Sequence, residues 1–209
     1  QKLLINSNEQ WILSETPSTS WQEKFTSKQI TYTCMNLLQE TKLLQKQEQH
    51  IQSFKNKYTA GTDFVLFNVA GITDETTWIN LLKAYTQFKQ WNKTGLKLLV
   101  GCAQEQKKKL GQLLESYKLR TDVVIHEIQS DAAWAETVAA SYMVADLTQS
   151  NTPTSIMLMS LQYGIPLIVL DESFVKAQWE EAALYVKPDK ASIASRMSLI
   201  YKDESGCVE

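Results

Sequence analysis

Residues 145–169 read ADLTQSNTPTSIMLMSLQYGIPLIV, and this stretch decides the fold. It begins inside a short apolar run, Val144–Thr148, which predicts a strand. Small and polar residues follow, and Pro153–Tyr163 then has the composition of a helix that opens on a proline and ends before Gly164. Pro166–Leu170 is a second buried strand. The stretch therefore predicts a strand–helix–strand unit, which is the building block of a parallel sheet.

The same alternation of short apolar runs and longer amphipathic segments extends in both directions from this unit. Strict alternation favours a mostly parallel sheet covered on both faces, with right-handed crossovers. We therefore predict an α/β fold with a doubly wound, mostly parallel six-stranded sheet. The further strands are Asp63–Ala70, Leu96–Gly101, Asp122–Ile128 and Leu184–Val186, and the further helices are Thr76–Asn92, Gln104–Lys118, Asp131–Ser141, Phe174–Ala182 and Asp189–Tyr201, with Asp131 and Asp189 as expected N-caps.

Ligands of such sheets bind beyond the carboxyl ends of the strands. This rule selects the loops that follow Ala70, Gly101, Ile128, Thr148 and Leu170 before any motif is considered.

The first sixty residues lack this alternation. Lys2–Ile5 and Gln29–Cys34 are candidate strands, and Trp21–Lys28 is a candidate short helix. Thr41–Tyr58 is a polar, glutamine-rich helix with a thin apolar stripe, which predicts a surface position or a bridge to another domain. The sequence does not begin with methionine, which favours a fragment of a longer protein. We therefore interpret residues 1–60 as an N-terminal extension.

Composition argues against several classes of function. With 21 basic and 23 acidic residues the net charge is -2, so no interaction with nucleic acid is expected. The three cysteines are widely spaced and odd in number, which indicates reduced thiols in a cytoplasmic protein. The two histidines, His50 and His126, have no ligand-like cysteines near them, so no metal site is expected. His126 is interpreted as a half-buried strand residue, because no carboxylate or nucleophile partner is evident.

Sequence motifs narrow the function further by their absence. No apolar run approaches the roughly 18 residues of a transmembrane segment. The dinucleotide (GxGxxG), P-loop, nucleophile-elbow (GxSxG) and HExxH motifs do not occur. We therefore expect no cofactor, and we argue against a dinucleotide-dependent oxidoreductase, a P-loop enzyme, a serine hydrolase and a zincin.

Two motifs occur in a fixed order among these elements. Gly164-Ile165-Pro166 separates a helix from a strand, and Glu180–Asp189 reads EEAALYVKPD ahead of the final helix. With the order of strands, these motifs resemble the C-terminal, donor-binding domain of group 1 retaining glycosyltransferases of the GT-B fold. The resemblance covers roughly residues 60 to 202. It implies a Rossmann-like nucleotide-sugar-binding-type domain at 61–209, with 1–60 as a remnant of, or linker to, an absent acceptor domain.

The chain departs from the family at both of its signature glutamates. The family places them eight residues apart, one facing the donor sugar and one holding the ribose. In this sequence the matching positions are Asn151 and Met159. Neither side chain is charged, and the thioether of methionine is a poor hydrogen-bond acceptor for a ribose hydroxyl.

The loop after the first main strand departs from the family as well. The family carries an arginine and a lysine there, which neutralise the departing diphosphate. The matching positions are about Gly71 and Thr76, and the loop instead contains Asp74 and Glu75. Since one donor of transition-state charge is worth about 3 kcal/mol, losing these groups should greatly weaken transfer.

What remains at these loops is polar and uncharged, and it permits two interpretations. Hydroxyl and amide groups at a helix N-terminus can form a cradle for a phosphate. The same residue types are also the preferred N-caps, so plain capping is the alternative. Cys102 is likewise either a reactive thiol or a small apolar residue. The candidate donor- or phosphate-binding residues are Asn151, Thr152, Thr154, Ser155, Thr73 and Cys102, and no catalytic residue is assigned.

Two leading hypotheses of function follow, beside a third in which the doubly wound domain binds some other phosphorylated small molecule. The first is a glycosyltransferase domain that transfers a sugar from a nucleotide diphosphate together with a missing N-terminal domain. The alternative is a non-catalytic pseudo-glycosyltransferase that pairs with a catalytic glycosyltransferase or forms a homo-oligomer. Both require the strands Asp63–Ala70 and Val144–Thr148 to be adjacent and parallel, because the ligand crevice opens where the strand order reverses.

Overall fold

The computed structural model describes residues 2–6, 9–13, 32–34, 48–70, 72, 74–149, 154–171 and 181–203. The chain divides into two units, Gln1–Thr41 and Lys42–Glu209. In the first unit, strand β1 (Lys2–Asn6) pairs antiparallel with β2 (Glu9–Leu13), and β2 pairs parallel with β3 (Tyr32–Cys34). Strand β2 was not predicted. The helix predicted over 21–28 lies outside the described residues.

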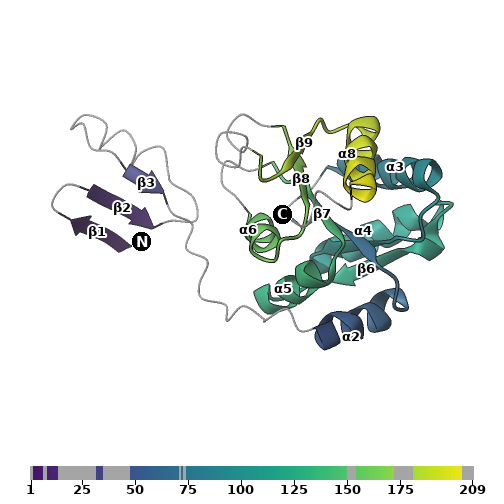
Figure 1. The fold of residues 1–209 in the computed structure, drawn as a ribbon, viewed down its shortest axis with the longest axis horizontal. Helices are drawn as coiled ribbons and strands as arrows, with labels where there is room; N and C mark the ends of the chain where they lie inside the picture. Colours follow the sequence, from purple (N-terminus) through teal and green to yellow (C-terminus); the bar gives the residue numbers. More distant parts are fainter. Residues whose placement is uncertain are drawn as a thin grey trace. The chain divides into compact units, whose positions relative to one another are not determined.

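The second unit contains the predicted six-stranded sheet, and every pair of neighbours is parallel (Figure 1). The strand order is β6-β5-β4-β7-β8-β9. The two central strands, β4 and β7, are therefore adjacent and parallel as required, with Asn68 opposite Asp146 at their carboxyl ends. The strands are β4 (Phe64–Asn68), β5 (Lys97–Cys102), β6 (Val123–Glu127), β7 (Met143–Asp146), β8 (Leu167–Leu170) and β9 (Leu184–Val186).

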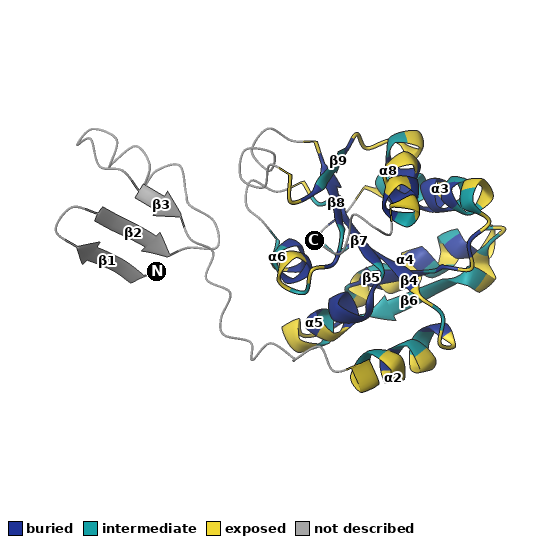
Figure 2. Cartoon of the chain, in the orientation of Figure 1, coloured by how far each residue is buried: buried dark blue, intermediate teal, exposed yellow. Residues whose placement is uncertain are grey.

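Helices cover both faces of this sheet, which confirms the doubly wound prediction (Figure 1). One face packs against α3, α4 and α8, and the other packs against α2, α5 and α6. The strands β4, β7 and β8 are buried along their whole length, because both faces are covered (Figure 2). The helices are α2 (Glu48–Thr59), α3 (Glu75–Asn92), α4 (Gln104–Glu115), α5 (Asp131–Ala140), α6 (Ser155–Gln162) and α8 (Lys190–Lys202), with a short 3-10 turn η1 at Arg120–Asp122.

The helix ends confirm some predicted caps and correct others. Asp189 caps α8 as predicted, and Gly164 follows α6 at a φ of +65° that favours glycine. Asp131 does not cap α5; the N-cap is Ser130, whose hydroxyl accepts from the Ala133 amide, while Asp131 is the first helical residue. Most of the predicted helix 174–182 lies outside the described residues.

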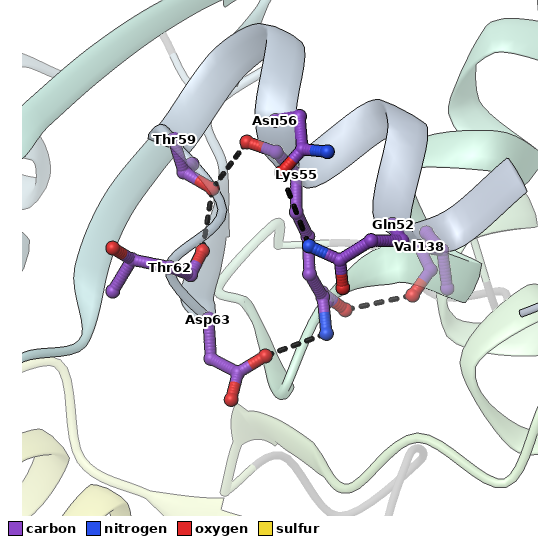
Figure 3. Close-up of polar contacts among 8 residues, drawn as sticks. Gln52, Lys55, Asn56, Thr59, Thr62, Asp63 and Val138 are labelled. Carbon is purple, nitrogen blue, oxygen red and sulfur yellow. Dashed lines mark hydrogen bonds and ion pairs between the residues drawn. The ribbon is translucent and has the colours of Figure 1, made fainter. Parts of the chain in front are cut away.

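Helix α2 lies on the surface of the sheet unit, as predicted, with most of its residues exposed and one side packed against the unit. Its Phe54 is buried against the sheet, and its C-terminal turn runs directly into β4 (Figure 3). An ion pair between Lys55 and Asp63 and a hydrogen bond from the Thr59 hydroxyl to the Thr62 carbonyl close this turn. The sheet unit therefore begins before residue 60.

Candidate functional site

A cavity of about 440 Å³ opens at the carboxyl edge of the sheet, where the strand-order rule places a ligand. Four parts of the chain form its walls: the loop from β4 to α3 with the first turn of α3, the segment after β7, the end of β8 and the turn before α8. The residues that line it are Ile72, Asp74, Thr77, Leu147, Gln149, Leu170 and Pro188. We refer to this cavity as the carboxyl-edge crevice.

The loop between β4 and α3 is held in place by Gln106 in the first turn of α4. Its amide nitrogen donates to the carbonyls of Val69, at 2.8 Å, and Ile72, at 3.0 Å. Its amide oxygen accepts from the Ala103 backbone nitrogen at 3.1 Å. Because this one carboxamide satisfies three backbone groups, it fixes the wall of the crevice that contains Ile72. Gln106 was not among the residues predicted from the sequence, because no neighbouring residue indicates its contact with a loop more than thirty residues upstream.

The N-terminus of α6 is fixed by a buried carboxylate. The Thr154 hydroxyl donates to Asp146 Oδ2 at 2.6 Å and accepts from the Met157 backbone nitrogen at 3.2 Å. Asp146 is fully buried at the end of β7, and its Oδ1 accepts from the Thr148 backbone nitrogen. The Thr154 hydroxyl therefore serves as an N-cap, and it both donates and accepts a hydrogen bond within the protein. Asp146 was not selected from the sequence.

Of the other candidate residues, the structure describes two. Ser155 is exposed at the first position of α6. Cys102 is the last residue of β5 and is fully buried in the core, so its thiol does not line the crevice. Burial raises the pKa of this thiol to about 11, which makes it an unreactive apolar group rather than a ligand contact. Asn151, Thr152 and Thr73 lie outside the described residues.

Met159 and Gly101 have packing roles. Met159, which stands where the resembled family has a glutamate, is a residue of α6 whose side chain is buried in the core. Gly101 lies under the indole ring of Trp134, where an added Cβ would come within 2.5 Å of a ring carbon. The loop after Gly101 and the candidate residue Cys102 were predicted to lie at the ligand site, and the structure places Gly101 and Cys102 against the hydrophobic core.

Helices α3 and α8 begin at the crevice, and a carboxylate caps each of them. Asp74 accepts from the Thr76 and Thr77 backbone nitrogens of α3, and Asp189 accepts from the Ala191 and Ser192 backbone nitrogens of α8. Asp146 acts on α6 through Thr154, as described above. The pKa of Asp74 is lowered, first by the hydrogen bond from the Thr77 hydroxyl and then by the Thr76 backbone amide, so this group carries its charge at neutral pH.

These carboxylates use the groups that would otherwise bind an anion. A free helix N-terminus attracts phosphate because its N–H groups are unpaired and its dipole is positive. Here two N–H groups of α3 and two of α8 donate to carboxylates, and one N–H group of α6 donates to the Thr154 hydroxyl. The sequence also contains no lysine, arginine or histidine between residues 64 and 82 or between residues 146 and 163, the two segments that contribute most of the wall. Of the described residues that line the carboxyl-edge crevice, Asp74 alone has a charged side chain.

Within the part of the chain that the structure describes, two further sites are not found. No cluster of histidine, cysteine and carboxylate side chains has the arrangement to hold a metal ion. None of the helices described has the length and apolar character that crossing a membrane requires.

Comparison with known proteins shows the fold. No protein-family model and no curated protein matches the sequence. Among solved structures, HepE of Anabaena in complex with UDP and glucose is similar over 92% of this chain, at 13% identity and a TM-score of 0.67. WaaG, a glycosyltransferase involved in lipopolysaccharide biosynthesis, is similar over 94% of the chain, at 11% identity and a TM-score of 0.65. The UDP-GlcNAc 2-epimerase of Methanocaldococcus jannaschii, in complex with UDP-GlcNAc and UDP, is similar over 95%, at 14% identity and a TM-score of 0.61.

These likenesses establish the Rossmann-like half of a GT-B fold, shared by glycosyltransferases and UDP-sugar epimerases. At such low identity they establish the fold alone. The chain spans 54% of the length of HepE and of WaaG and 55% of the epimerase, which is about half of each solved structure.

Proposed function

We propose that this chain is the donor-side domain of a glycosyltransferase-like protein, and that it does not itself transfer a sugar. Its role in this proposal is to pair, through the retained fold, with a catalytic glycosyltransferase or with a second copy. The fold supports the first part, because structures of similar fold are complexes with UDP, with UDP and glucose, or with UDP-GlcNAc and UDP. The carboxyl-edge crevice supports the second part.

The observation that carries the proposal is the carboxylate that caps each of two helices at the crevice, α3 and α8. Asp74 and Asp189 add negative charge at a site where stabilising a departing diphosphate would call for positive charge. Asp74 itself lines the cavity, and Asp189 follows the lining residue Pro188. A transition state in which charge builds up on the departing diphosphate would be destabilised here rather than stabilised.

An active transferase is the second candidate, and one observation favours it. The chain covers only about half of HepE and of WaaG, and a glycosyltransferase of the resembled family would act together with a second, N-terminal domain. Basic residues contributed by another half could compensate for the carboxylates of this one. The two candidates differ in whether the intact protein turns over a sugar nucleotide without a partner.

We expect the intact protein to release no UDP or GDP from UDP-glucose, UDP-GlcNAc or GDP-mannose above the rate of a heat-denatured sample. The physical reason is the loss of transition-state stabilisation, since each missing charge donor removes about 100-fold to 1,000-fold in rate. A coupled nucleotide-release assay measures this directly, with a known glycosyltransferase as the positive control. Nucleotide release at a steady, enzyme-dependent rate by the protein alone would contradict the proposal and favour an active transferase.

A further inference from the structure

The imidazole of His126 lies between helix α2 and the edge of the sheet. Its ring centroid is 4.3 Å from that of Tyr58 and 5.8 Å from that of Phe54, and both aromatic residues belong to α2. Phe54 is buried, and His126 is half-buried on the edge strand β6. Docking of α2 therefore covers this imidazole with apolar rings, and removing α2 would expose it to water.

The charged groups around His126 do not favour a positive imidazolium. Lys57 on α2 and Lys107 on α4 both act on it electrostatically. The carboxylate of Glu127, on the same strand, is already bonded to Lys107 at 3.0 Å and to the side-chain amide of Gln129 at 2.6 Å. On α5, Glu136 acts on Lys57. No described residue provides a hydrogen-bond acceptor to either imidazole nitrogen.

We propose that His126 makes the docking of α2 sensitive to pH, so that protonation of the imidazole weakens the packing of α2 against β6. A proton added to the docked ring must be carried in a half-buried site between aromatic rings, near two lysines. The same proton on the undocked ring is solvated by water. Protonation therefore favours the undocked state by linkage.

The direction of the effect follows from the groups named above. Burial, followed by the charges of Lys57 and Lys107, lowers the pKa of His126 below its ordinary value. A base whose pKa is lowered by docking binds fewer protons in the docked state. Docking is therefore most stable above the ordinary histidine pKa of about 6.5, and it weakens as the pH falls below that value.

The position of α2 in the chain determines which part of the unit loosens when its docking weakens. Helix α2 is the first described element of the sheet unit and directly precedes β4, so it connects the rest of the sheet to the segment leading back to Gln1–Thr41. The pairing of β4 with β5 and with β7 does not include His126. Lowering the pH should therefore loosen α2 locally while the sheet remains folded.

Hydrogen exchange on the whole chain, at about pH 7.5 and about pH 5.5, tests this proposal. After correction for intrinsic exchange rates, we expect the protection of α2 amides to fall by about threefold to tenfold at the lower pH, because one pH unit below the ordinary pKa limits the linkage to about tenfold. Amides of α3 are the internal reference and should not change.

His126→Phe keeps an aromatic ring that cannot titrate, and its α2 protection should be equal at both pH values. Lys57→Gln removes one of the two cations and should reduce the fall in protection. Unchanged α2 protection in the wild-type chain would overturn the proposal. So would a gain in protection at low pH, which is the outcome if the Tyr58 ring stabilises an imidazolium. The same fall in His126→Phe would also overturn it. None of these outcomes depends on nucleotide binding.

Discussion

Replacing Thr154 by valine should destabilise the sheet unit by about 2–4 kcal/mol, one of the two largest effects that we expect from a single substitution. The hydroxyl caps α6 through the Met157 amide and also donates to the buried carboxylate of Asp146. Loss of an N-cap costs about 1 kcal/mol. Loss of a donor to a buried charged group costs a further 1–3 kcal/mol or so, because the carboxylate cannot exchange it for water.

Thr154→Ser is the matched control, since it keeps the hydroxyl and removes only a methyl group. Urea unfolding followed by circular dichroism gives the free energy of unfolding for both variants. We expect the serine variant to remain within about 1 kcal/mol of the wild type. Equal unfolding midpoints for the valine and serine variants would show that the hydroxyl does not stabilise the N-terminus of α6.

Gly101→Ala should destabilise the protein by about 1–3 kcal/mol, because the added methyl group has no room. Its Cβ would lie 2.5 Å and 2.7 Å from two carbons of the Trp134 ring and 3.2 Å from Ile128 Cδ1. The ring must move as a whole, since an indole has no flexible end that can yield. Thermal or urea unfolding measures the loss.

The same substitution at Gly111 should have the opposite sign. Gly111 lies inside α4, and an added Cβ there meets nothing within 4 Å. Gly111→Ala should therefore stabilise the chain by about 0.5–1 kcal/mol through helix propensity. In the double variant Gly101→Ala/Trp134→Leu the clash is relieved, so the two changes should be non-additive. Strict additivity would mean that the indole does not cause the cost at Gly101.

Most of the sheet unit could be predicted because the spacing of apolar residues along the sequence indicates its strands and helices. Runs such as Phe64–Asn68 and Leu167–Leu170 are continuously apolar, and a strand buried on both faces requires this pattern. Strand β2, Glu9–Leu13, was missed because glutamate and glutamine occupy two of its five positions. The cap of α5 was assigned one residue too late, because Ser130 and Asp131 are both good N-caps and stand side by side.

The details of the crevice were less predictable, because they depend on contacts between distant segments. From the sequence, Thr154 is a candidate both as a cap and as a ligand contact. Its hydrogen bond to Asp146, eight residues earlier, favours the role of a cap, and this bond is seen only in the structure. Cys102 was expected just beyond its strand; since β5 extends to residue 102, the side chain points into the core instead. The acidic loop containing Asp74, in contrast, was visible in the sequence, and the structure adds that Asp74 lines the cavity.

Titration of UDP into the intact protein by calorimetry tests the central claim most directly, with Asp74→Asn as the matched variant. Asparagine caps a helix as well as aspartate does, so this change removes the charge and keeps the N-terminus of α3 in place. We predict no saturable binding by the wild type at millimolar UDP, and a measurable gain in affinity for Asp74→Asn. Saturable wild-type binding of UDP that Asp74→Asn leaves unchanged or weakens would contradict the claim that the chain's own carboxylates keep a diphosphate out of the carboxyl-edge crevice.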